Sequence, residues 1–128
     1  MKIIIDYSLL ILWTIVMIIL MGAPSDSLPL KPLFFGFDKL AHCGTFYVFT
    51  VLYFHGYIVH TKRRGSKIRS IIYAFFLGSL MAFGTEAIQL YYSSGRVADW
   101  WDIFADYMGI GMAILSYMLF YYKRTTYK

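Results

Sequence analysis

Apolar residues dominate four long stretches of the chain, and each has about the length that crosses a bilayer as a helix. Roughly 20 helical residues span a hydrocarbon core about 30 Å thick. Inside lipid the backbone polar groups must be satisfied internally, so these stretches are expected to be helical. The pattern predicts an all-α integral membrane bundle of four transmembrane helices, forming a single domain over residues 1–128. The predicted spans are Ile3–Met21, Leu40–Val59, Ile68–Tyr92 and Ile103–Tyr122.

The first apolar stretch also lies where a secretory signal peptide would lie. Only one basic residue, Lys2, precedes it, and Asp6 falls inside it. A signal peptide has a positively charged start and a cleavage site marked by small residues, and no persuasive site of that kind follows here. We therefore expect an uncleaved first span.

Basic residues between the spans predict the orientation of the bundle, because cytoplasmic loops carry an excess of lysine and arginine. Of the 12 basic residues, nine fall on the side that holds both termini and the 61–69 connection. A multi-pass protein of the bacterial cytoplasmic membrane is expected, with both termini in the cytoplasm and the 22–37 and 93–102 connections outside. The nine residues are Lys2, Lys62, Arg63, Arg64, Lys67, Arg69, Lys123, Arg124 and Lys128, and the remaining three are Lys31, Lys39 and Arg96.

Polar side chains recur at helical spacing near the predicted outer ends of three spans. Residues three or four apart share one face of a helix. Ionisable groups in membrane segments are costly, so they usually face one another or a cavity and mark function. Three helices are therefore predicted to bring polar side chains to one layer near the outer leaflet. The pairs are Asp38 and His42, Glu86 and Gln89, and Asp102 and Asp106.

Small residues repeat on two of the same spans and predict which faces point inward. Ala74, Gly78 and Ala82 recur every four residues and lead to Glu86, and Gly109 and Ala113 continue the face of the last acidic pair. Small residues allow membrane helices to approach closely. Ordinary helix packing explains such stripes, and their use is to orient the polar faces toward the interior.

Composition agrees with a membrane protein and argues against nucleic-acid binding. The chain is 59% hydrophobic and 15% charged, whereas about a quarter of the residues in a typical soluble domain are charged. The net charge of +5 would suggest a nucleic-acid partner only if the basic residues formed one solvated face. They form short clusters between apolar segments instead. The single cysteine, Cys43, has no partner for an internal disulfide.

The polar residues fall in three blocks along the chain. The blocks are Asp38-Lys39-Leu40-Ala41-His42, Glu86-Ala87-Ile88-Gln89, and Arg96, Asp99, Asp102, Asp106 and Gly109 with their intervening residues. They resemble those of the VanZ-like family of small bacterial membrane proteins, and their order and spacing agree with the family over about residues 36–113. The family pattern usually has asparagine where this chain has Asp106, which adds a charge here. The family is named for a protein linked to teicoplanin resistance, so the resemblance implies a role in the cell envelope, with an effect on glycopeptide susceptibility, and it does not establish an enzyme.

Glu86 and His42 are the strongest candidates for chemistry. A carboxylate among apolar neighbours needs a partner charge or is poised for general acid or base work. Its alternative role is a buried salt bridge to Arg96 or Lys39. An imidazole can bind a metal or carry a proton, or it can hydrogen-bond to Asp38 or Glu86 and hold helices together.

A divalent metal is a further possibility, although no specific motif indicates one. Carboxylates suit magnesium, calcium or manganese, and histidine with carboxylates also allows zinc. The same four residues are the candidates for catalysis and for metal binding: Asp38, His42, Glu86 and Asp102.

Arg96 and Lys39 are candidates for binding a phosphate at the membrane edge. A guanidinium binds phosphate in a bidentate fork, and it could equally clamp Asp99 or Asp102. Asp99 is expected to cap the last span, because aspartate is a preferred N-cap residue. Gln89 and Asp106 are expected to support the site.

The expected function is a cell-envelope protein whose polar site near the outer leaflet engages an anionic lipid or a lipid-linked envelope precursor. A membrane-embedded hydrolase or transferase acting on a lipid phosphate is the first alternative. The second is a structural or partner-binding subunit whose polar residues only hold the helices together.

Overall fold

The computed structural model describes residues 1–22, 37–92 and 100–125, and these segments are helices joined by turns. Side chains are described for residues 1–21, 39–91 and 100–120. No strand occurs in these segments, so the predicted all-α class is confirmed for them. The helices are α1 (Lys2–Asp6), α2 (Ser8–Gly22), α3 (Phe37–His60), α4 (Lys67–Tyr92) and α5 (Trp100–Thr125).

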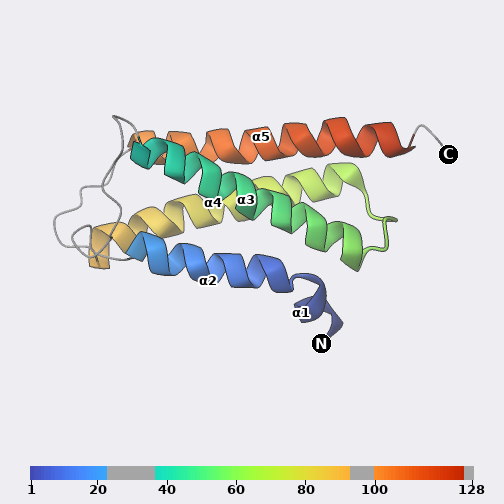
Figure 1. The fold of residues 1–128 in the computed structure, drawn as a ribbon, viewed down its shortest axis with the longest axis horizontal. Helices are drawn as coiled ribbons and strands as arrows, with labels where there is room; N and C mark the ends of the chain where they lie inside the picture. The colour runs from blue at the N-terminus through green and yellow to red at the C-terminus, as the bar shows by residue number, and fades with distance from the viewer. Residues whose placement is uncertain (23–36, 93–99, 126–128) are drawn as a thin grey trace.

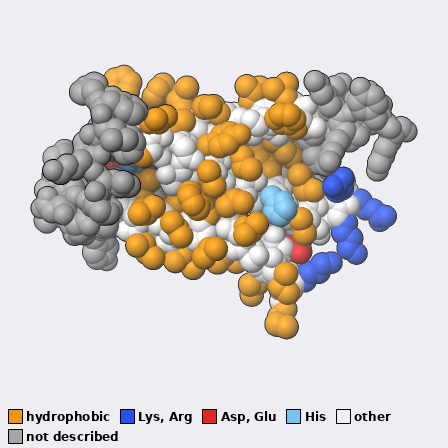
Figure 2. Space-filling view, in the orientation of Figure 1, with side chains coloured by type: hydrophobic (Ala, Val, Ile, Leu, Met, Phe, Trp, Pro, Cys, Tyr) orange, Lys and Arg blue, Asp and Glu red, His pale blue; other side chains and the backbone are white. Residues whose placement is uncertain are grey.

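The four long helices run alongside one another, and chemically different groups lie at the two ends of the bundle (Figure 1). We call one end the polar end. It contains the first turns of α3 and α5 and the last turns of α4. The other end, the basic end, contains α1, the turn between α3 and α4, and the last turns of α5. Figure 2 shows Lys and Arg side chains gathered at this second end, while hydrophobic side chains cover the middle of the visible face.

The predicted first span is wrong as one continuous helix, because the chain breaks at Tyr7 between α1 and α2. The neighbouring Asp6 carboxylate accepts a hydrogen bond from His60 Nδ1 at 2.9 Å. The Tyr7 ring lies against Tyr53 and directly over Gly56, where any Cβ atom would overlap it. These contacts with α3 hold the short helix α1 out of line with the axis of α2.

Two of the four predicted spans are clearly long and apolar enough to cross a membrane. Among the described residues these are Lys67–Tyr91 in α4 and Trp100–Phe120 in α5. The 15 residues of α2 cover only about 22 Å at about 1.5 Å per residue. The 24 residues of α3 are long enough, but this helix is not among those apolar enough to count as candidate spans.

The outer surface of the bundle is apolar, as expected for contact with lipid. Phe120 is 75% exposed, Leu80 70% and Phe76 67%. A soluble monomer rarely leaves large contiguous apolar patches exposed. The exposed apolar side chains and the two spanning helices therefore indicate a membrane environment.

The stripes of small residues pack inward, as the sequence predicts. Ala74, Ala82 and Ala113 are almost completely buried. A Cβ atom on Gly78 would overlap the side chain of Ile110, which places α4 close to α5. The bundle interior is otherwise filled by larger hydrophobic side chains from α2, α3 and α5: Met17, Phe46, Phe49, Phe54, Ile110 and Tyr117.

Helices α3 and α5 approach each other closely at Gly109. A Cβ atom there would overlap the Cys43 carbonyl oxygen and come within 2.9 Å of the Tyr47 backbone nitrogen. Backbone atoms cannot move aside as a flexible side chain can. Only glycine therefore permits this spacing.

We expect the change Gly109→Ala to lower the free energy of unfolding in detergent by about 1–3 kcal/mol, the usual cost of overpacking. The matched control is Gly111→Ala, because a Cβ atom on Gly111 meets nothing within 4 Å. Thermal unfolding followed by circular dichroism measures both. Equal stability of the two variants would contradict the close approach.

Candidate functional site

Polar side chains from three helices meet at the polar end of the bundle. Residues at the start of α3 face residues at the start of α5, and the last turns of α4 close the third side. We call the group the polar cluster. Its members are Lys39, His42, Glu86, Asp102 and Asp106.

His42 is the centre of the polar cluster. Its Nδ1 lies 2.9 Å from Asp106 Oδ1, and the imidazole N–H is the donor if the carboxylate is ionised. Its Nε2 lies 3.8 Å from Asp102 Oδ2. The imidazole therefore lies between two carboxylates that are one turn apart on α5, hydrogen-bonded to Asp106 and close to Asp102.

Lys39 lies one helical turn before His42 on α3, and it also contacts α5. Its Nζ is 2.5 Å from Asp102 Oδ1. The lysine side chain is 31% exposed and the aspartate side chain is 13% exposed. Asp102 therefore has one oxygen directed to a cation near the surface and the other directed to His42.

Asp106 is completely buried, yet only one of its carboxylate oxygens has a hydrogen-bond partner among the described residues. Oδ1 accepts from His42, and Oδ2 is the buried oxygen without a partner. A buried charged group usually has all of its oxygens satisfied. This oxygen marks a place in the cluster that can accept a further hydrogen bond.

Glu86 reaches the cluster from α4. One ligating atom from each of Glu86, His42 and Asp102 can be chosen so that all three lie within 4.8 Å of one another. Glu86 and His42 are both buried. One nitrogen and two carboxylate oxygens are a donor set that fits a divalent metal such as zinc or manganese.

The structure thus brings together three of the four residues predicted for catalysis or metal binding. The fourth, Asp38, belongs to α3, but its side chain lies outside the described residues, as do Arg96 and Asp99. Phosphate binding by Arg96 and helix capping by Asp99 stay predictions.

The structure adds two contacts that were not predicted. His42 bonds to Asp106, because the imidazole points across to α5. Lys39 forms a short ion pair with Asp102. The predicted bond from His42 to Asp38 or Glu86, and the predicted contacts of Lys39 with Glu86 or a lipid phosphate, stay predictions.

Gln89 is buried and makes a contact with α2. Its Nε2 donates to Met21 Sδ at 3.5 Å. A thioether is a weak acceptor. This contact joins the end of α4 to the end of α2, so Gln89 braces the helix that carries Glu86.

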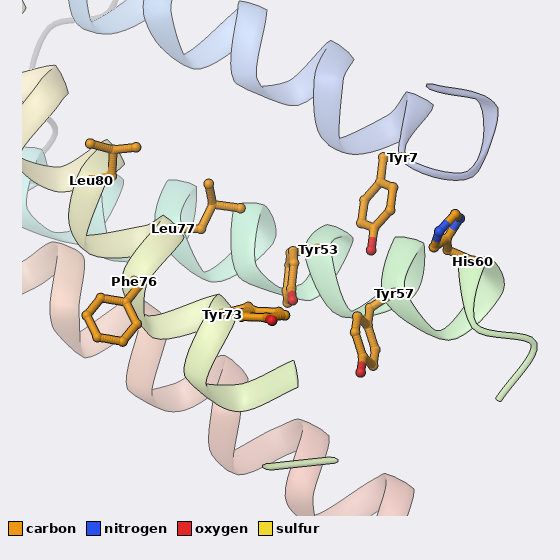
Figure 3. A pocket seen from close by; sticks show the side chains of 8 residues that line it. All are labelled: Tyr7, Tyr53, Tyr57, His60, Tyr73, Phe76, Leu77 and Leu80. Atoms are coloured by element: carbon orange, nitrogen blue, oxygen red, sulfur yellow. The ribbon is translucent and has the colours of Figure 1, made fainter. Parts of the chain in front are cut away.

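A second feature, at the basic end, was not predicted. A cavity of about 530 Å³ lies between the α1–α2 junction, α3 and α4. Figure 3 shows Tyr7 directed toward Tyr53 and Tyr57 of α3, with side chains of α4 on the opposite side. Tyr53, Tyr57 and His60 recur at helical spacing, which was the available signal in the sequence. The lining residues are Tyr7, Tyr53, Tyr57, His60, Tyr73, Phe76, Leu77 and Leu80, none of them a predicted site residue.

Comparison with known proteins gives one match. A family model described as VanZ/LLP1 matches residues 2–121. Searches of the curated proteins and of the solved structures each give no match.

His42→Leu should lower the free energy of unfolding by about 3 kcal/mol, because it leaves the buried Asp106 carboxylate without its hydrogen-bond donor. Chemical denaturation in detergent measures the change. His60→Leu is the matched control, since His60 makes the same type of bond to Asp6 but its side chain is 38% exposed. That variant should lose less than about 1 kcal/mol. Equal losses in the two variants would show that burial does not distinguish the pairs.

Proposed function

This chain belongs to the VanZ/LLP1 family, and we propose that it is a multi-pass protein of the bacterial cell envelope that engages an anionic lipid at its polar cluster. A lipid-linked envelope precursor is the second possible source of this ligand, because both molecules carry a phosphate attached to an apolar chain. The observation that carries the proposal is a buried group of ionisable side chains at one end of an apolar bundle. Such groups are costly in a membrane and usually serve function.

The proposed orientation places the basic end in the cytoplasm and the polar end near the outer leaflet. The exposed Lys62, Arg64 and Arg69 at or beside the α3–α4 turn support this orientation through the excess of positive charge on cytoplasmic loops. In this arrangement the chain forms a single domain that crosses the membrane four times. Helix α2 makes the first crossing, and α1 lies along the inner membrane surface. Ile3, Ile4 and Ile5 are all more than half exposed, which suits a segment at the lipid boundary.

Groups of both signs in the cluster suit a phosphate-bearing lipid. The Lys39 ammonium lies in the more exposed part of the cluster, where a headgroup phosphate can approach it. Carboxylate oxygens accept hydrogen bonds from hydroxyl groups, which glycerol headgroups and sugar-bearing precursors supply. Glu86 and Asp102 are the carboxylates that we propose for this role.

Lipid engagement is tested by cross-linking a photoreactive phosphatidylglycerol to the full chain in vesicles. We expect Lys39→Ala and Glu86→Gln each to reduce cross-linking about 10-fold or more, since a hydrogen bond to a charged group contributes about 1.5–3 kcal/mol. His60→Gln at the basic end is the control and should cross-link as the wild type does. A photoreactive polyprenyl phosphate in the same vesicles distinguishes the precursor from an ordinary phospholipid.

The same variants, expressed in bacteria, link the site to glycopeptide susceptibility. Lys39→Ala and Glu86→Gln should change teicoplanin susceptibility in the same direction as deletion of the protein, while His60→Gln should not. Unchanged cross-linking and unchanged susceptibility in variants that stay folded would refute lipid engagement at the cluster.

Hydrolysis or transfer on a lipid phosphate is the second candidate, favoured by the grouping of His42 with two carboxylates. Release of inorganic phosphate from lipid phosphates, with and without a chelator, separates this activity from binding alone.

A purely bracing role is the third candidate, because both Lys39 and His42 join α3 to α5. Bracing alone requires every loss of cross-linking to follow a matching loss of thermal stability.

A further inference from the structure

We propose that His42, Glu86 and Asp102 form a binding site for one divalent cation, with zinc or manganese the best match to their donor atoms. The site would hold the ion through one imidazole nitrogen and one oxygen from each carboxylate. Three protein ligands leave at least one coordination position for a ligand that is not protein.

The spacing of the donor atoms is close to what one ion requires. The three atoms lie within 4.8 Å of one another. Bonds of about 2.0–2.2 Å in a tetrahedral site place its donors about 3.5 Å apart. Side-chain movements of about 1 Å would therefore close the site around an ion.

Asp106 supplies an independent sign of a metal site. Histidine ligands usually donate their second ring N–H to a carboxylate, which fixes the ring and makes the ligating nitrogen more basic. The Nδ1 of His42 faces Asp106 at 2.9 Å, and the Nε2 faces the side of Asp102. Asp106 is completely buried and holds a second oxygen, Oδ2, without a partner among the described residues. This oxygen can accept a hydrogen bond from water bound to the ion.

Charge in the cluster favours a cation. Glu86, Asp102 and Asp106 bring three carboxylates together, and Lys39 contributes the one lysine or arginine charge among the described members. Such a group of carboxylate oxygens attracts a divalent cation.

The basic end offers an internal comparison. His60 and Asp6 form a bond of the same type and length as His42 and Asp106. Among the described residues, the group at the polar end is the one set of three metal-ligating side chains close enough to share an ion. A histidine–carboxylate pair alone is therefore not the feature that distinguishes the site.

The cation would also connect the acidic cluster to the proposed ligand. A phosphate approaching three carboxylates is repelled, whereas a phosphate oxygen can occupy an open position on a bound cation. This bridging role rests on the proposed function, but cation binding itself does not.

Cation binding is tested on the full chain purified in detergent, stripped with a chelator and titrated separately with zinc and manganese chloride by equilibrium dialysis and elemental analysis. We expect one ion per chain, and a rise in the unfolding temperature that the chelator reverses. His42→Gln, Glu86→Gln and Asp102→Asn should each weaken binding at least about 10-fold, and Asp106→Asn by about 10-fold as a positioning residue. Glu86→His, which restores a ligand, should bind more tightly than Glu86→Gln. His60→Gln is the matched control and should bind as the wild type does.

Two outcomes overturn the proposal: no binding of either ion below about 1 mM, or equal affinity in the His42 and His60 variants. If a variant does not fold, two other measurements test the site. One is the rise in the unfolding temperature of the wild-type chain with the ion, and the other is the affinity of Glu86→His. Cross-linking of photoreactive phosphatidylglycerol with and without the chelator then separates the two ideas. Ion binding without lipid cross-linking supports the cation site alone, and cross-linking that is independent of any ion supports the lipid function alone.

Discussion

The close approach of α3 and α5 determines where the polar cluster forms. Gly109 brings its helix against the backbone of α3 at Cys43 and Tyr47. His42 immediately precedes Cys43, and Asp106 lies one turn before Gly109, so the same approach places imidazole and carboxylate at hydrogen-bonding distance. A larger residue at position 109 would separate the two helices and would lengthen this bond and the one between Lys39 and Asp102. Packing of a residue with no side chain therefore controls the geometry of the charged ones.

The two ends of the bundle use similar bonds in different surroundings. At the basic end, His60 and Asp6 form a partly exposed pair beside a tyrosine-lined cavity. At the polar end, His42 and Asp106 form a buried pair next to two further carboxylates. Burial and the presence of additional acidic groups, rather than the pair itself, make the polar end the candidate site.

Helical spacing was sufficient to predict which faces converge, but not which side chains bond. The intervals between Asp102 and Asp106, and between the small residues and Glu86, place these groups on inward faces, because one turn of helix is nearly four residues. Which carboxylate meets His42 depends on how far α3 is rotated and shifted against α5. That relation is set by contacts between residues distant in the chain, such as Gly109 with Cys43. The break at Tyr7 escaped prediction for the same reason, since it depends on contacts with Tyr53, Gly56 and His60 of α3.

The sequence separation of the bonded pairs sets an order in which the bundle can be completed. The bond between His60 and Asp6 joins residues 54 positions apart and needs only the first three helices. The bonds of Lys39 and His42 to α5 join residues 63 and 64 positions apart and need the last helix. Because a chain emerges from the ribosome starting at its N-terminus, the bond between His60 and Asp6 can form before α5 has been made. Until the first turns of α5 have been made, Lys39, His42 and Glu86 lack its two aspartates, so the candidate site forms after the bond between His60 and Asp6.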